Sequence, residues 1–261
     1  MDHTYWHKQT SNNPIFPDLV WSRPENRAHA GKLLIVGGNL HGFSAVATAF
    51  SEADKAGIGT ARALLPSSLQ KTVGRIFEAG EYAPSTPSGS FAQTALSEML
   101  AMAAWSDGVL LAGDFGRNSE TAIVLEKFAA KYSGQLTLTK DAADYFTPSP
   151  KALLQRPATT FVISFSQLQQ LGMHAQFISP FTYNMDLLRL LDALHEFTTI
   201  YPVSIIVKHL QNIVVATSGK VSTTKLEADL EMWRVATAAH AAVWWLQNPS
   251  KTFEALTTSV A

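Results

Sequence analysis

The chain has 261 residues, of which 46% are hydrophobic and 16% charged, a balance that supplies a sizeable core and excludes intrinsic disorder. Its formal net charge of -1 gives no electrostatic basis for binding nucleic acid or an anionic membrane. Cysteine is absent, which excludes disulfides, zinc–thiolate sites and thiol nucleophiles within this sequence.

Residues 1–30 are polar and contain Pro14, Pro17 and Pro24, so we expect an extended arm there. The amino-terminal stretch lacks the apolar segment that is typical of a secretory signal. The chain also has no run of about eighteen uninterrupted apolar residues, the length that a membrane span needs. We therefore expect a cytoplasmic protein without membrane partners.

From residue 31 onward, short apolar runs alternate with segments of helical spacing. The apolar runs, typical of strands buried on both faces of a parallel sheet, lie at residues 32–38, 59–66, 108–113, 135–139, 159–164 and 203–208. The helical segments lie at residues 44–57, 67–77, 93–105, 119–132, 184–200 and 226–247. A hairpin is expected over residues 212–223, with its turn at Ser218 and Gly219. This order predicts one domain over residues 31–261, a mostly parallel sheet covered by helices on both faces.

The loop after the first apolar run contains Gly37, Gly38 and Gly42 but matches no complete phosphate-binding motif. A dinucleotide fingerprint needs G-x-G-x-x-G and an acidic residue at the end of the next strand, and that strand ends here in ALLP. A P-loop would need Lys where Phe43 stands, and HGFSA is not the G-x-S-x-G elbow of a hydrolase. Two interpretations stay open: a ligand-binding loop at a strand end, or a tight turn that binds nothing.

Several segments form an ordered series along the chain. Gly31, Lys32, Gly37 and Gly38 precede an alanine-rich helix and KAGIGTARALLP. DGVLLAGDFGRNSET, LTLTKDAADYF and VSIIVKHLQNIVVATSGKV follow. The series resembles the glycine-rich opening, the G-P-G-L-G-R loop, the D-A-D-A-L turn and the K-G-x-x-T hairpin of the ADP- or ATP-dependent NAD(P)H-hydrate dehydratases. That resemblance, over roughly residues 27–247, implies the three-layer α/β/α fold of the ribokinase-like superfamily.

Enzymes of that family repair NADH or NADPH hydrated at the nicotinamide ring: ADP or ATP phosphorylates the hydroxyl, and loss of phosphate restores the cofactor. The resemblance implies ATP or ADP with magnesium as cofactor and an NAD(P)H-like small-molecule ligand. Residue by residue, it implies a substrate-binding set of Asn39, His41, Gly116, Arg117 and Asp141, with Asp141 the catalytic candidate, and a nucleotide-binding pair of Lys208 and Asn212. No metal site of the chain's own is expected, since His3 and His7 stand at i, i+4 without a third ligand.

The segment that carries catalysis in the family differs in this chain. In the family, a G-T-G-D sequence at a helix amino terminus holds phosphates with glycine amides and activates the hydroxyl with its aspartate. Alignment on AAVWWLQNP puts that segment, here called the G-T-G-D slot, at Met232, Trp233, Arg234 and Val235. Neither glycine nor carboxylate remains there, and valine cannot accept a proton. Thr139 also replaces the first acid of the D-A-D-A-L turn.

Three hypotheses about function follow. The first is a divergent dehydratase-like protein, a pseudoenzyme that has lost the phosphoryl-transfer centre but keeps a cleft for a nucleotide-like ligand. The second is an active dehydratase or small-molecule kinase in which Asp114, Asp141 or Asp229 serves as a relocated base. The third is a non-catalytic assembly protein, a homo-oligomer with the tryptophan-bearing last helix at its interface.

The candidate side chains also have purely structural interpretations. His41 is equally a solvated loop residue. Asp114, Arg117 and Asn118 suit helix capping and a local ion pair. Asp141 opens a predicted helix, where a carboxylate is favourable whether or not it has a function.

Overall fold

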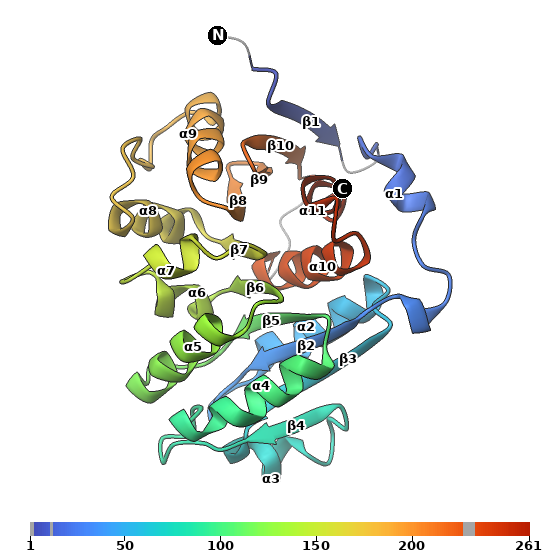
Figure 1. Ribbon diagram of the computed structural model, residues 1–261, viewed down its shortest axis with the longest axis vertical. Coiled ribbons are helices and arrows are strands. Elements are labelled where there is room, and N and C mark those ends of the chain that lie inside the picture. Colours follow the sequence, from blue (N-terminus) through green and yellow to red (C-terminus); the bar gives the residue numbers. More distant parts are fainter. Residues whose placement is uncertain (1–2, 11–12, 227–232) are drawn as a thin grey trace.

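The computed structural model describes residues 3–10, 13–226 and 233–261. Within these residues a ten-stranded sheet has the order β1-β10-β9-β8-β7-β6-β5-β2-β3-β4 (Figure 1). All neighbouring strands run parallel except β9, which is antiparallel to both β8 and β10. The strands are β1 (Trp6–Thr10), β2 (Lys32–Gly37), β3 (Thr60–Pro66), β4 (Gly80–Ala83), β5 (Gly108–Gly113), β6 (Gln135–Thr139), β7 (Thr159–Ile163), β8 (Val203–His209), β9 (Asn212–Thr217) and β10 (Lys220–Lys225).

Helices cover both faces of this sheet. One face carries α4 (Leu96–Trp105), α5 (Ser119–Lys131), α6 (Asp141–Phe146), α7 (Lys151–Leu154), α8 (Phe165–His174) and α9 (Leu187–Ile200). The other face carries α2 (Ser44–Lys55), α3 (Gln70–Val73), α10 (Trp233–Gln247) and α11 (Thr252–Thr258). Helix α1 (Pro17–Trp21) packs on α11, and three 3-10 turns lie at η1 (Arg27–His29), η2 (Ser67–Leu69) and η3 (Gln93–Ala95). The predicted three-layer α/β/α fold is confirmed.

Strand β2 shows why the apolar runs form central strands. Leu34 and Val36 pack into the hydrophobic cluster under α4 and α5, whereas Leu33 and Ile35 pack into the cluster under α2 and α10. All four side chains are fully buried, and each such burial contributes about 1.5–3 kcal/mol. A strand covered on both faces therefore favours a nearly continuous apolar run, which is the pattern of β2 in the sequence.

The chain leaves β2 and β5 in opposite directions, so the two strands form the topological switch point of the sheet. Helix α2 carries the chain from β2 to β3 on one side, and α4 returns it to β5 on the opposite face. The ends of β2 and β5 are in close contact, because the Gly38 amide donates to the Gly113 carbonyl at 3.0 Å. A Cβ at Gly37 would lie 2.4 Å from that same carbonyl oxygen, so the approach requires glycine there. Ligands of open α/β sheets bind beyond such strand ends.

The amino-terminal segment, expected as an extended arm, contains elements of the folded unit. Strand β1 pairs in parallel with β10 and adds an edge strand to the sheet. The Tyr5 hydroxyl donates to the Asp192 carboxylate on α9, and its ring stacks on His195 with ring centroids 4.1 Å apart. An edge strand and a surface helix each have one solvated side, so this segment can fold and still be rich in polar residues. For this reason the sequence showed no apolar run that would predict β1.

Other differences concern short or terminal elements. Strand β4 was not predicted, and the expected helix over residues 67–77 is reduced to η2 and α3. The closing helix was expected from Leu226, whose amide instead donates to the Gln211 carbonyl at the β8–β9 turn. Helix α10 is described from Trp233 onward. The hairpin turning at Ser218 and Gly219 is confirmed by the pairing of β9 with β10.

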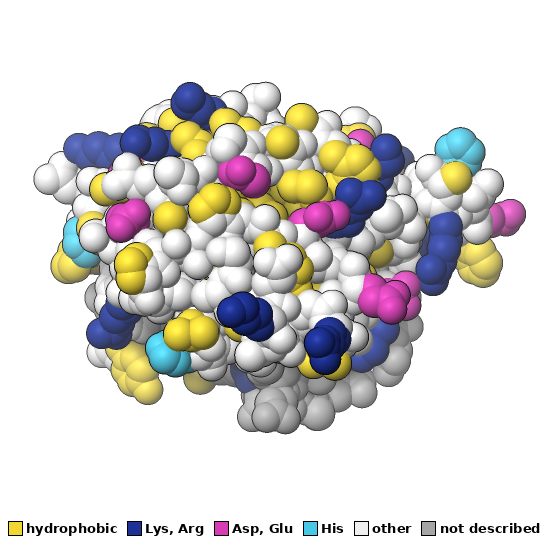
Figure 2. Space-filling model, turned by 90° about the horizontal axis from the view of Figure 1, so that it is seen from below, with side chains coloured by type: hydrophobic (Ala, Val, Ile, Leu, Met, Phe, Trp, Pro, Cys, Tyr) yellow, Lys and Arg dark blue, Asp and Glu magenta, His cyan; other side chains and the backbone are white. Residues whose placement is uncertain are grey.

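The surface of the molecule carries both charge signs. In the view of Figure 2, Lys and Arg side chains are interspersed with Asp and Glu side chains across the visible face. Within the described residues, no helix is both long enough and apolar enough to cross a membrane.

Candidate functional site

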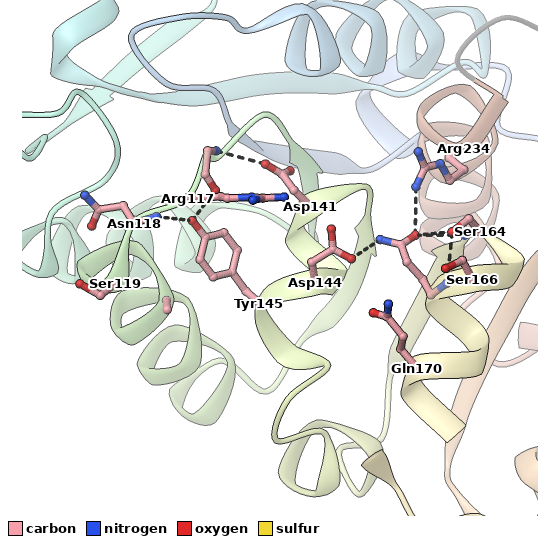
Figure 3. A pocket seen from close by; sticks show the side chains of 13 residues that line it. Arg117, Asn118, Ser119, Asp141, Asp144, Tyr145, Ser164, Ser166, Gln170 and Arg234 are labelled. Atoms are coloured by element: carbon pink, nitrogen blue, oxygen red, sulfur yellow. Dashed lines mark hydrogen bonds between the residues drawn. The ribbon is translucent and has the colours of Figure 1, made fainter. Parts of the chain in front are cut away.

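The main candidate site is a pocket of about 720 Å³ at the carboxyl ends of β5, β6 and β7. The loop after β5, residues of α5, α6 and α8, and the first described turn of α10 line it (Figure 3). The lining residues are mostly polar: Gly116, Arg117, Asn118, Ser119, Ala122, Asp141, Asp144, Tyr145, Ser164, Ser166, Gln167, Gln170 and Arg234. This place beside the β2/β5 switch point is where an open α/β sheet binds ligands. We call it the strand-end pocket.

Tyr145 holds the loop that follows β5. Its hydroxyl donates to the Gly116 carbonyl at 2.6 Å and accepts from the Asn118 amide at 3.1 Å. The Asn118 side chain in turn accepts the amides of Glu120 and Thr121 in the first turn of α5, as the sequence predicted. The loop that presents Gly116 and Arg117 to the pocket is therefore fixed at both ends.

Asp141, the first residue of α6, is the acidic group of the pocket with unused acceptor capacity. Its Oδ2 accepts the Gly116 amide at 3.1 Å, whereas its buried Oδ1 has no hydrogen-bond partner among the described residues. Burial raises the pKa of this carboxyl, the nearby charge of Asp114 raises it further, and the Gly116 amide opposes both effects. Burial thus disfavours the ionised form of a carboxyl group at the edge of a ligand-sized space.

Asp114, at the end of β5, has the opposite character. Its carboxylate accepts Lys140 Nζ at 2.6 Å, the Ala45 amide at 2.7 Å and the Ser44 hydroxyl at 3.1 Å. Burial alone would raise the pKa of Asp114, but the hydrogen bonds from Lys140, Ala45 and Ser44 together hold it below its usual value. Asp114 therefore joins the loop after β5 to the start of α2 and to β6, which is a structural role.

The opposite wall of the pocket is a hydrogen-bonded chain centred on the buried Gln167. Gln167 Nε2 donates to Asp144 at 2.6 Å and to the Lys140 carbonyl at 2.7 Å. Gln167 Oε1 accepts the Ser164 amide at 3.0 Å in the capping box of α8, and also accepts Arg234 Nη1 at 2.9 Å. In Figure 3, dashed lines from Asp144 and from Arg234 lead to one side chain between them, the amide of Gln167 by its hydrogen bonds. The side chain of Arg234 is thereby held at the pocket.

No protein-family model matches this sequence, and neither does any curated protein. Solved structures do match. A ribokinase-like superfamily protein from Enterococcus faecalis superposes with a TM-score of 0.72 over 100% of this chain and 86% of its own, at 12% identity. The fold is ribokinase-like.

Other ribokinase-like structures are similar over most of their length. ADP/ATP-dependent NAD(P)H-hydrate dehydratase from Bacillus subtilis, co-crystallised with ATP and magnesium, has a TM-score of 0.62 over 96% of this chain and 87% of its own, at 12% identity. Pyridoxal kinase from Staphylococcus aureus, in complex with AMP-PCP and pyridoxal, has a TM-score of 0.55 over 88% of this chain and 85% of its own, at 12% identity. At these identities the likeness establishes the shared fold.

The predicted substrate-binding residues fall into two groups in this ribokinase-like fold. Gly116, Arg117 and Asp141 line the strand-end pocket. Asn39 is not a lining residue: its Nδ2 donates to the Asp114 carbonyl at 2.6 Å and its Oδ1 accepts the His41 amide at 2.7 Å, so it braces the glycine loop against β5. The His41 side chain is exposed and does not line the pocket.

The predicted nucleotide-binding pair lies elsewhere. Lys208, near the end of β8, faces Ile213 across the hairpin, and Asn212, at the start of β9, faces His209. Neither residue lines the strand-end pocket. Their nucleotide-binding role stays a prediction.

The G-T-G-D slot is described from its second position. Trp233 packs against the cluster under α2 and α10, Val235 is 1% exposed, and Arg234 reaches Gln167. Thr139, the replacement for the first acid of the D-A-D-A-L turn, is fully buried at the end of β6. The first position of the slot, Met232, and one of the acids considered as a relocated base, Asp229, lie outside the described residues.

Sequence reasoning missed Tyr145, Asp144 and Gln167. Gln167 had a local signal, because Ser164 and Gln167 stand at the S-x-x-Q spacing of a capping box. Tyr145 had none, since its partners belong to the loop after β5 and only the fold brings them together. Within the described residues, no group of three or more His, Asp or Glu side chains could hold a metal ion.

Proposed function

We propose that this ribokinase-like protein binds a nucleotide-like small ligand in the strand-end pocket and lacks the phosphoryl-transfer centre of the dehydratases that its sequence resembles. The observation that carries the proposal is Arg234. A guanidinium held by Gln167 borders the pocket from the start of α10, in the slot where the family has glycine and a carboxylate.

The described residues of the slot cannot perform the family's chemistry. Phosphoryl transfer needs a group that accepts the proton of the attacking hydroxyl and donors that hold the transferred phosphate. Val235 is buried and aliphatic, and Trp233 fills apolar space against α2. The guanidinium of Arg234 offers hydrogen-bond donors and no acceptor, so it can bind an anion but cannot serve as the base.

The pocket still supplies what recognition of a nucleotide-like ligand requires. Guanidinium groups can contact phosphate, and the hydroxyls of Ser119 and Ser166 can contact ribose or other hydroxyl groups. The volume of about 720 Å³ lies in the range of small-molecule sites. ATP or ADP would bind with its phosphates toward the arginines. Any magnesium would be held mainly by those phosphates and water, because the described residues offer no cluster of three ligands.

The test is a thermal-shift panel of nucleotides and nicotinamide cofactors, together with a turnover assay. The turnover assay mixes the protein, hydrated NADH, and ADP or ATP, and follows recovery of the reduced-nicotinamide absorbance. We expect at least one nucleotide to raise the melting temperature by several degrees at about a hundredfold excess over Kd, which corresponds to about 2.7 kcal/mol. We expect no recovery of absorbance. A flat panel would overturn the proposal and favour the assembly-protein hypothesis.

A second candidate function rests on Asp141. Its unpartnered Oδ1 and its raised pKa are properties of a general acid or base. Among the relocated bases considered, Asp114 is committed to Lys140, Ala45 and Ser44. If the turnover assay shows dehydration or kinase activity, and D141N abolishes it while nucleotide binding survives, this candidate replaces the first.

A further inference from the structure

The two arginines of the strand-end pocket come from opposite walls. Arg117 follows β5, and Arg234 belongs to the first described turn of α10. No hydrogen bond or ion pair joins the Arg117 guanidinium to another described residue. Figure 3 shows the Arg117 side chain extending into the pocket, on the side where Tyr145 and Asp141 lie. The side chain is exposed, so the fold gains no stabilisation from placing a positive charge there.

The Arg234 guanidinium is held in place, and its single described bond goes to a neutral group. It donates one hydrogen bond to Gln167 Oε1. Gln167 is 8% exposed, and its amide is fixed by Asp144, the Lys140 carbonyl and the Ser164 amide. An arginine carries several N–H donors in a rigid fork. Orienting the fork through an amide rather than a carboxylate leaves its positive charge uncompensated by that partner.

The two acidic residues of the pocket are bonded to groups other than its arginines. Asp144 Oδ1 accepts Gln167 Nε2, and Asp141 Oδ2 accepts the Gly116 amide. The nearby cation Lys140 is already paired with Asp114 at 2.6 Å. Among the described residues, therefore, neither guanidinium of the pocket is paired with a carboxylate.

We infer that the strand-end pocket holds the anionic group of its ligand, a phosphate or pyrophosphate ester, between Arg117 and Arg234. The inference rests on the proposed function and names the ligand class of the same site. In this arrangement Arg234 supplies with its side chain the contact that the family makes with glycine amides in the G-T-G-D slot. The hydroxyls of Ser119 and Ser166 are the additional donors that a tetrahedral phosphate can use.

The test is calorimetric titration of the full chain with inorganic pyrophosphate at low and at moderate salt. R117Q and R234Q each remove one guanidinium, and R75Q removes an exposed guanidinium from the loop after α3 that does not line the pocket. We expect R117Q and R234Q each to weaken pyrophosphate binding about tenfold to a hundredfold, and R75Q to leave it unchanged. R234K keeps the charge but not the fork, so its affinity should fall between those of wild type and R234Q.

The outcomes separate this inference from the proposed function. If wild type does not bind pyrophosphate, or if R117Q and R234Q bind it as tightly as R75Q does, the inference is overturned. If nucleotides stabilise wild type, R117Q and R234Q equally, the inference fails and the proposed function stands. If pyrophosphate binds through both arginines but no nucleotide stabilises the protein, the proposed function fails and the anion site stands. R117Q keeps the test decisive if R234Q does not fold, because Arg117 has no bonded partner among the described residues.

Discussion

Asp114 and Asp141 follow neighbouring strands of the sheet and lie on the same side of it, yet their environments have opposite effects on their carboxyl groups. Asp114 is bound by Lys140, the Ala45 amide and the Ser44 hydroxyl, which lower its pKa. Asp141 accepts the Gly116 amide but leaves its Oδ1 without a hydrogen-bond partner among the described residues, and burial raises its pKa. Burial acts to raise the pKa of both groups, and only at Asp114 do the bonded partners outweigh it. A carboxylate with every oxygen engaged is part of the framework, and one with an unused oxygen at a pocket remains available for a ligand.

The largest expected effect is that of removing Asp114. D114A leaves the Lys140 ammonium, the Ala45 amide and the Ser44 hydroxyl without their acceptor, so we expect the free energy of unfolding to fall by about 2–3 kcal/mol in urea at pH 7. The pKa of Asp114 is lowered by folding, so this stabilisation is present above the unfolded-state pKa and is lost as the pH falls through the folded-state pKa. The gap between wild type and D114A should therefore narrow in acid.

The matched control for D114A is D54N. Asp54 pairs with Arg27 at 3.1 Å, but both side chains are more than half exposed. An exposed ion pair contributes about 0–1 kcal/mol. D54N should therefore lower the free energy of unfolding by about 1 kcal/mol at most. Equal losses in D114A and D54N would contradict the structural role given to Asp114.

The next largest effect is expected from removing the side chain of Gln167, an uncharged group of the pocket that forms several hydrogen bonds. Q167A removes the reciprocal bond of the α8 capping box and the bonds to Asp144 and Arg234. We expect a loss of about 1–2 kcal/mol in urea unfolding. Q170A, a change of the same kind at an exposed residue of the same pocket, is the control and should stay near wild type. A silent Q167A would show that the chain from Asp144 to Arg234 is not a fixed wall.

The contribution of Asp141 to stability should depend on pH in the opposite sense to that of Asp114. Its pKa is raised by folding, so its contribution to stability is fully present below the unfolded-state pKa and is lost as the pH rises through the folded-state pKa. Relative to D141N, wild type should therefore lose stability as the pH rises from acid toward neutral. Unfolding curves of the two proteins, recorded at a series of pH values from acid to neutral, would measure this difference. A parallel pair of pH profiles would remove the basis for assigning acid–base chemistry to Asp141.

The smallest expected effect concerns Tyr5 at the amino-terminal edge. Burial and the bond to Asp192 raise the pKa of Tyr5 to about 12. The stabilisation that the Tyr5 hydroxyl contributes to the folded state is complete below the unfolded-state pKa of 10.0 and is lost as the pH rises through about 12. Y5F should cost about 0.5 kcal/mol at pH 7 and should flatten this alkaline loss. An unchanged alkaline unfolding profile in Y5F would show that the bond from Tyr5 to α9 does not hold the β1 edge.

Much of the fold was predictable because its signals are local. The mostly apolar runs that became β2, β5, β6, β7 and β8 are readable without the fold, since strands buried on both faces are rich in apolar residues. Asn118 was predictable as a helix cap because its partners lie within three residues of it. Strand β1 was not predictable, because its pairing partner β10 is distant in the chain and an edge strand needs no apolar pattern.

The sequence by itself determined the three-layer architecture, the strand-end position of Gly116, Arg117 and Asp141, and the loss of glycine and carboxylate from the described part of the G-T-G-D slot. Only the tertiary structure decided that the carboxylate of Asp114, and not that of Asp141, has hydrogen-bond partners on both oxygens. It also decided that Arg234 contacts Gln167 at the pocket. The physical reason is that apolar periodicity reports burial against solvent. Hydrogen bonds between residues far apart in the chain depend on distances of about 3 Å, which exist only once the strands have been brought into register.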